Sequence, residues 1–176
     1  MAKMRQSKRG GRMADTGEAF WRFSLALYAR PGAAPALLAL QDRSGRDVNL
    51  MLFALWVGAV RGFRLAAADL AAAEAASIDL RRPIVEPLRG LRRQLKDDRD
   101  PDLQEMRRRV LMLELAAERR VQQRLAASLR VDAGPVQPDA QLVAAEANLA
   151  LYLGDEDRSA EAALLRDALA SLTRCN

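Results

Sequence analysis

The chain has 176 residues, half of them apolar, which is enough for one domain with a buried core. The 34 alanines and 25 arginines are strong helix formers and predict an all-α protein. The chain has no histidine and one cysteine, Cys175, which excludes histidine-based catalysis, most zinc sites and an intrachain disulfide. The net charge of +5 is uneven, with a basic tail over 1–14, a basic segment over 79–130 and an acidic segment over 131–176.

Two helices are predicted before the first glycine-rich turn. The first begins at Asp15 or Thr16, where Glu18 would complete a capping box with Asp15. It is expected to end at Arg30-Pro31-Gly32, because proline and glycine interrupt helices. A short second helix is expected over residues 33–42.

The aromatic residues are concentrated in this region. Seven of the eight lie between Phe20 and Phe63, so this segment is expected to organise the core. Phe20, Trp21 and Phe23 are too close in sequence for all three rings to face one direction. At least one ring is therefore expected at the edge of the core or in a groove, and an exposed Trp21 would indicate a site for a hydrophobic partner or a ligand.

A third helix is predicted over residues 48–62, with Asp47 as its N-cap. From Leu50 to Val60 the sequence is apolar almost all round, as in a helix at the centre of a bundle or in a membrane. The run is shorter than the roughly 20 residues needed to cross a bilayer. We therefore expect a central helix whose core residues include Leu50, Phe53, Leu55 and Trp56.

The sequence before this helix, LQDRSGRDVN, is the first candidate site. Together with Trp21, the residues Arg46, Asp47 and Asn49 could line a pocket for a ligand or partner, since free N–H groups at a helix start favour an anion. In the alternative, Asp47 is only a cap, Asn49 only satisfies a backbone group, and the arginines only pair with carboxylates.

Two segments also resemble a known family. These are FWRFSLALYARPG and LLALQDRSGRDVNLMLFALWVG, and they resemble a family of short bacterial proteins known as a domain of unknown function. The resemblance covers about residues 18–130 and is centred on Phe20–Gly58. It implies no activity, substrate or catalytic residue.

The middle of the chain predicts a helical hairpin arm. A helix over 65–77 is followed by a predicted break at Arg82-Pro83 and by a helix with an apolar stripe at Ile84, Leu88, Leu91 and Leu95. The longest helix, about 102–129, has heptad-like apolar spacing typical of such an arm. The aspartates at 97, 98, 100 and 102 are interpreted as capping and loop residues, and no metal site is predicted.

The last segments complete the predicted domain organisation. Residues 15–130 form a helical core domain and arm, and 131–138, with Gly134 and two prolines, form a linker. Acidic helices over 139–153 and 156–173 are expected to pack on the core.

The hairpin also carries the second candidate site. Arg89, Arg92, Arg93 and Lys96 recur at i, i+3, i+4 and i+7, and Arg107 and Arg108 add charge on the next helix. These six side chains could form one basic surface for phosphate. In the alternative, they form an ordinary solvated face among interspersed glutamates.

These observations favour a helical bundle that acts as a non-enzymatic adaptor or protein-interaction module, without cofactor or metal. The alternatives are a nucleic-acid- or ribosome-associated protein that uses the basic surface, and a helical protein that binds a small ligand. The basic start is followed by no apolar signal core, so a cytoplasmic protein is expected. Peripheral membrane attachment is the least favoured partner class.

Overall fold

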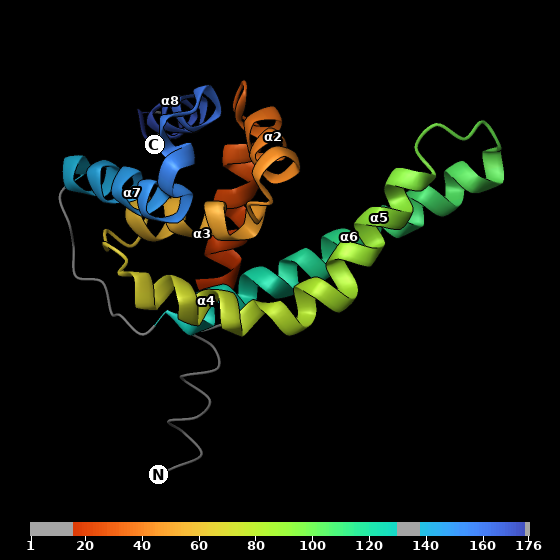
Figure 1. Ribbon diagram of the computed structural model, residues 1–176, viewed down its shortest axis with the longest axis horizontal. Coiled ribbons are helices and arrows are strands. Elements are labelled where there is room, and N and C mark those ends of the chain that lie inside the picture. The colour runs from red at the N-terminus through yellow and green to blue at the C-terminus, as the bar shows by residue number, and fades with distance from the viewer. Residues whose placement is uncertain (1–15, 130–137, 175–176) are drawn as a thin grey trace, which may run out of the picture.

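The computed structural model describes residues 16–129 and 138–174 (Figure 1). These residues form helices and turns without a strand, which confirms the predicted all-α bundle. Four features of the sequence lie outside the described residues: the basic tail, the Asp15 cap, linker residues 131–137 and Cys175.

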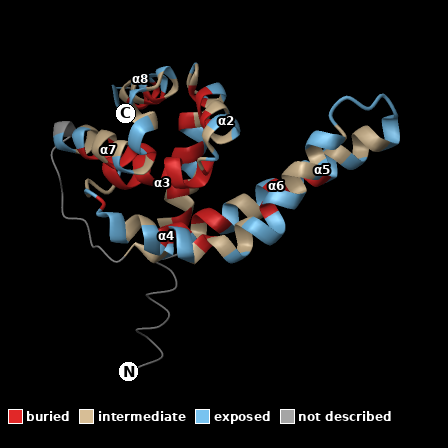
Figure 2. Cartoon of the chain, viewed as in Figure 1, coloured by how far each residue is buried: buried red, intermediate tan, exposed pale blue. Residues whose placement is uncertain are grey.

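Helix α3 (Val48–Ala59) lies at the centre of a body formed by four other helices (Figures 1 and 2). These are the N-terminal helix (Thr16–Tyr28), α2 (Ala33–Ser44), α7 (Pro138–Leu153) and α8 (Ala160–Arg174). All 12 residues of α3 are buried because the helix has no polar face to turn to water. The predicted core residues Leu50, Phe53, Leu55 and Trp56 are at most 2% exposed, which confirms that prediction.

Aromatic rings connect α3 to the N-terminal helix. The ring of Phe20 stacks on Trp56 with centroids 5.0 Å apart and meets Phe53 edge-on at 5.9 Å. Phe20 and Phe23 are buried, whereas Trp21 is half-buried. One ring of the three therefore lies at the edge of the core.

Helix α7 contacts α3 backbone to backbone. A Cβ atom on Gly58 of α3 would lie 2.1 Å from the backbone nitrogen of Ala145 in α7. One turn further along α7, the Asn148 amide donates to the carbonyls of Ala54 and Phe63, and its Oδ1 accepts from the Leu65 N–H. The close approach and these three hydrogen bonds fix α7 against α3 and the segment that follows it.

The arm projects from the body as a long hairpin (Figure 1). Its first limb contains α4 (Ala67–Leu80), the π-helical turn η1 (Arg81–Val85) and α5 (Glu86–Gln94), and its second limb is α6 (Pro101–Ser128). The break predicted at Arg82-Pro83 is wrong, because the helical path continues through η1. There the Glu86 N–H bonds to the Arg81 carbonyl five residues back, and this wider turn accommodates a proline that cannot donate.

Capping residues mark the starts of α3 and α6 and the end of α2. Asp47 is the N-cap of α3, as predicted, and its Oδ1 accepts from the Leu50 N–H at 3.0 Å. Asp100 caps α6 in the same way through the Asp102 N–H, with Pro101 in the first turn. Helix α2 runs to Ser44, two residues beyond the prediction, and ends at Gly45, whose φ of 65° is in the left-handed region that glycine tolerates.

Within the described residues, no single helix is long and apolar enough to span a membrane. The N-terminal helix and α2 are long and apolar enough only when taken together, and their axes are bent by 99° at the break between them.

Candidate functional site: an apolar groove between body and arm

A groove of about 320 Å³ runs between the body and the arm, and we call it the elbow groove. Four partly exposed leucines from three helices line it: Leu25 of the N-terminal helix, Leu38 of α2, and Leu111 and Leu115 of α6. They are 52%, 42%, 37% and 37% exposed, respectively. The half-buried rings of Trp21 and Tyr28 extend the same apolar wall.

The N-terminal helix forms this wall because two of its faces are apolar. Phe20 and Leu27 face inward and are fully buried. Trp21, Leu25 and Tyr28 recur at i, i+4 and i+7, which places them together on a second face along the groove. One helix therefore supplies both core packing and an accessible apolar surface.

Three buried polar side chains lie beneath the apolar wall. The Ser24 hydroxyl lies 3.0 Å from the Phe20 carbonyl and 3.1 Å from Oε1 of Gln122. The Gln122 amide donates to Oδ1 of Asn49 at 2.9 Å. Each of the three polar residues is at most 3% exposed. Asn49, a polar residue on an otherwise apolar helix, thus has a partner on α6, as a buried amide requires.

Four charged residues complete the floor of the groove. Arg89 donates to Glu118 at 2.5 Å and to Glu114 at 3.2 Å, and Arg92 also bonds to Glu114. Burial raises the pKa of Glu118, and Arg89 opposes this effect. Burial also raises the pKa of Tyr28 to about 12, with a contribution from the negative charge of Glu118. The two guanidiniums and two carboxylates satisfy one another, so the floor holds no unbalanced charge.

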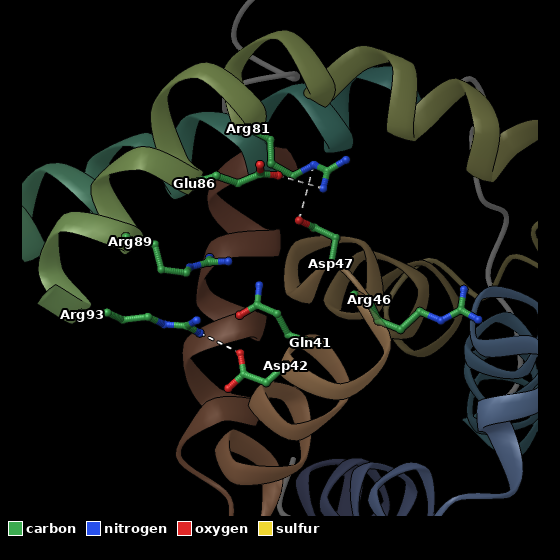
Figure 3. Close-up of a pocket in the computed structure, with 10 residues that line it drawn as sticks. Gln41, Asp42, Arg46, Asp47, Arg81, Glu86, Arg89 and Arg93 are labelled. Carbon is green, nitrogen blue, oxygen red and sulfur yellow. Dashed lines mark hydrogen bonds and ion pairs between the residues drawn. The ribbon is translucent and has the colours of Figure 1, made fainter.

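A second, polar cleft of about 370 Å³ lies on the body side of α5 (Figure 3). Arg93 bonds to Asp42 at 2.8 Å, and Arg81 lies 3.5 Å from Asp47 and 3.4 Å from Glu86. The arginines along this cleft are therefore largely matched by carboxylates of the same chain.

The family comparison covers this whole region. The family model described as "Protein of unknown function (DUF2390)" matches residues 19–125. The chain belongs to this family, which confirms the resemblance seen in the sequence. No curated protein and no solved structure matches the chain. The family region contains every residue that lines the elbow groove, whereas α7 and α8 lie beyond it.

The four predicted pocket residues are divided between the two cavities. Trp21 and Asn49 line the elbow groove, whereas Arg46 and Asp47 line the polar cleft. Burial raises the pKa of Asp47, with Arg81 acting against this shift. In Figure 3, Arg46 points away from the other side chains, and its guanidinium donates to the carbonyls of Tyr152 and Leu153 at the end of α7.

The six predicted basic residues differ in their contacts and exposure. Arg89 and Arg92 are turned between α5 and α6, where they pair with glutamates. Arg93 pairs with Asp42, and Arg108 pairs with Glu105 on its own helix. The remaining two differ in exposure: Arg107 is half-buried and Lys96 is exposed.

The leucines of the elbow groove were missed in the sequence, although two signals were present. The N-terminal helix has more apolar positions than one face can hold. In α6, the segment LMLEL at residues 111–115 is apolar around most of the helix. Among the described residues, no group of acidic, histidine or cysteine side chains could hold a metal ion.

Proposed function

We propose that the protein is a non-enzymatic interaction module whose elbow groove binds an amphipathic helical segment of another protein. The observation that carries this proposal is the convergence of four partly exposed leucines from three helices on one groove. Apolar side chains gathered in this way are characteristic of protein-binding surfaces. The cytoplasm expected from the sequence is the proposed setting.

The dimensions of the groove favour a helix. Its two long walls run from Trp21 to Tyr28 on the N-terminal helix and from Leu111 to Gln122 on α6. At 1.5 Å per residue, these walls are about 10 and 16 Å long, which corresponds to roughly two to three turns of a bound helix. Apolar residues of such a helix, spaced at i, i+3, i+4 and i+7, would contact both walls.

The charges of the site favour an apolar occupant over phosphate. Arg89 and Arg92 are balanced by Glu114 and Glu118 beneath the groove. A polyanion would have to compete with these buried ion pairs, and breaking such a pair is costly. The nucleic-acid alternative therefore has less support. A small apolar ligand is the other alternative, since 320 Å³ is within the size range of small-molecule pockets.

Site-specific photo-cross-linking in cells tests the proposal. A photoreactive amino acid at Leu38 or at Leu111 should give the same discrete protein adduct, because the two positions face one groove from different helices. The adduct should disappear when Leu115→Arg is added. The same probe at Leu151, which is 42% exposed on α7 outside the groove, is the control and should not give this adduct.

Two controls make the result decisive. Leu115 is 37% exposed, so the Leu115→Arg protein should keep the circular dichroism spectrum and melting behaviour of the parent. An adduct that persists in this variant, a nucleic-acid adduct, or no protein adduct at either groove position would contradict the proposal.

A further inference from the structure

The arm has a second apolar surface, which we call the outer arm face. It consists of Ile84 in η1, Leu91 in α5, and Met106 and Leu113 in α6. These side chains are 42%, 40%, 49% and 59% exposed, respectively. Of the apolar stripe predicted for the first limb of the hairpin, Ile84 and Leu91 are therefore exposed, whereas Leu88 and Leu95 are half-buried.

Helical geometry places this surface on the side of the arm away from the body. Leu113 lies two residues after Leu111, and two residues correspond to about 200° around a helix. Leu91 stands in the same relation to Arg93. Leu111 faces the elbow groove and Arg93 faces the polar cleft, and both cavities lie between arm and body. The outer arm face is consequently accessible along both helices.

The inside of the hairpin explains why apolar side chains lie outside. Between α5 and α6, the ion pairs of Arg89 and Arg92 with Glu114 occupy positions that leucines usually take in a helical hairpin. The described arm is thus a single layer of two helices in which buried ion pairs accompany apolar side chains such as Val85 and Val110, while further apolar side chains lie on its outer face. A second helical layer would bury those leucines, and two identical hairpins provide such a layer in a four-helix bundle.

The charges along the arm determine the orientation of a second hairpin. The exposed tip carries aspartates at 97, 98, 100 and 102 against two bases, Lys96 and Arg99. Arg120 and Arg124 lie near the opposite end of α6, and both are exposed; Arg124 pairs with Asp79 of α4 at 3.6 Å, whereas the Arg120 guanidinium bonds to the uncharged side chain of Gln123. Met106, Leu113 and Arg120 recur every seven residues and share one face, and Asp102 lies one turn before Met106. An antiparallel partner would place its acidic tip beside this basic end.

We propose that two copies of the chain associate through their outer arm faces as an antiparallel, two-fold-symmetric four-helix bundle. In this arrangement Asp102 of each copy faces Arg120 of the other. The two residues are 18 positions apart in one helix, about 27 Å, so they cannot meet within one chain. A two-fold interface is self-complementary, and one type of contact therefore forms twice.

The proposed dimer leaves the elbow groove accessible, because the groove and the outer arm face lie on opposite sides of the hairpin. An arm about 27 Å long and two helices, or about 20 Å, wide offers a modest area. Stable interfaces bury about 800 Å² per partner. We therefore expect a reversible dimer whose dissociation constant is in the micromolar range, about 1–100 μM.

Sedimentation velocity of the full chain tests this association. Over about 1–200 μM, the parent should shift from a 19.4 kDa species towards twice that mass. Leu113→Arg should remain monomeric at every concentration, whereas Leu151→Arg, on α7, should associate like the parent. A parent that stays monomeric throughout, or a Leu113→Arg protein that still dimerises, would overturn the proposal.

A charge exchange tests the orientation. Asp102→Arg and Arg120→Asp should each weaken dimerisation at least several-fold, and the double variant should recover most of the affinity because each interface regains both opposite-charge contacts. A double variant as weak as the singles would exclude the antiparallel arrangement. Leu113→Arg should leave cross-linking in the elbow groove unchanged, so failure of the dimer and failure of the groove are distinguishable.

Discussion

The backbone contact between α3 and α7 predicts a large effect of a single methyl group at Gly58. An alanine Cβ there would lie 2.1 Å from the Ala145 nitrogen and 2.2 Å from its Cα. Both are backbone atoms, so no side-chain rotation can relieve the overlap. Ordinary contact between heavy atoms requires about 3.5 Å, and α3 and α7 would have to separate by more than about 1 Å.

This separation would also affect the Asn148 amide. Its bonds to the Ala54 carbonyl, the Phe63 carbonyl and the Leu65 N–H are 3.2, 2.8 and 2.8 Å long. A displacement of more than about 1 Å would take them beyond hydrogen-bond range. Overpacking costs about 1–3 kcal/mol, and each buried polar group left unpaired costs about 1–3 kcal/mol. We therefore expect Gly58→Ala to lower the free energy of unfolding by about 3 kcal/mol or more.

Urea denaturation followed by tryptophan fluorescence and far-UV circular dichroism measures this loss. Gly90→Ala is the matched control, because nothing lies within 4 Å of a Cβ at this position in α5. Alanine is about 1 kcal/mol better than glycine inside a helix, so this control should be as stable as the parent or more stable. A Gly58→Ala protein with the stability of the parent would refute the close contact between α3 and α7.

Three further predictions concern single polar groups. Asp47→Ala should cost about 0.5–2 kcal/mol of stability in urea melts, and Asp47→Asn, which preserves the cap, should cost clearly less; equal losses would argue against capping. Burial raises the pKa of Glu118 in the folded protein, so the unfolded chain loses this proton at a lower pH than the folded protein does. The contribution of this group to the free energy of unfolding therefore falls as the pH rises above about 4.5, the ordinary pKa of a glutamate. The stability of Glu118→Gln relative to the parent should therefore improve from pH 4 to pH 7, and a difference independent of pH would contradict the shift. The pKa values of Tyr28 and Tyr152 are both raised to about 12, mainly by burial. Absorbance titration of the folded protein should therefore show no phenol with a midpoint near 10, and detection of one would contradict the burial.

Local sequence signals predicted the parts of the fold that depend on neighbouring residues. Asp47 before an apolar run predicted a capped helix, and the missing polar face of that helix predicted its central position. The break at Pro83 was predicted wrongly because proline only removes one donor and restricts the preceding turn. Whether the helix stops at Pro83 or widens into a π turn depends on the packing of η1 against α6. The spacing of residues in the sequence does not reveal that packing.

The candidate sites depended more on tertiary contacts. The arginine pattern predicted one basic surface, but Arg89 and Arg92 pair with Glu114, which lies more than 20 positions further along the chain. Arg46 was grouped with Asn49 on sequence proximity, yet Arg46 contacts the end of α7 and Asn49 contacts Gln122 on α6. Arg46 and Asn49 are only three positions apart, but they lie on either side of the start of α3, and their side chains therefore enter different cavities.

The sequence by itself determined the all-α class, the buried central helix, the capped helix starts and the family, because composition, periodicity and motifs are local properties of the chain. Only the tertiary structure decided which apolar faces are covered. The N-terminal helix and α6 each carry more apolar surface than their contacts bury. The elbow groove lies where the arm and the body leave Leu25 and Leu111 only partly covered. The arm and the body are joined here by contacts between residues distant in sequence, including Arg119 with Glu18 and Gln122 with Asn49.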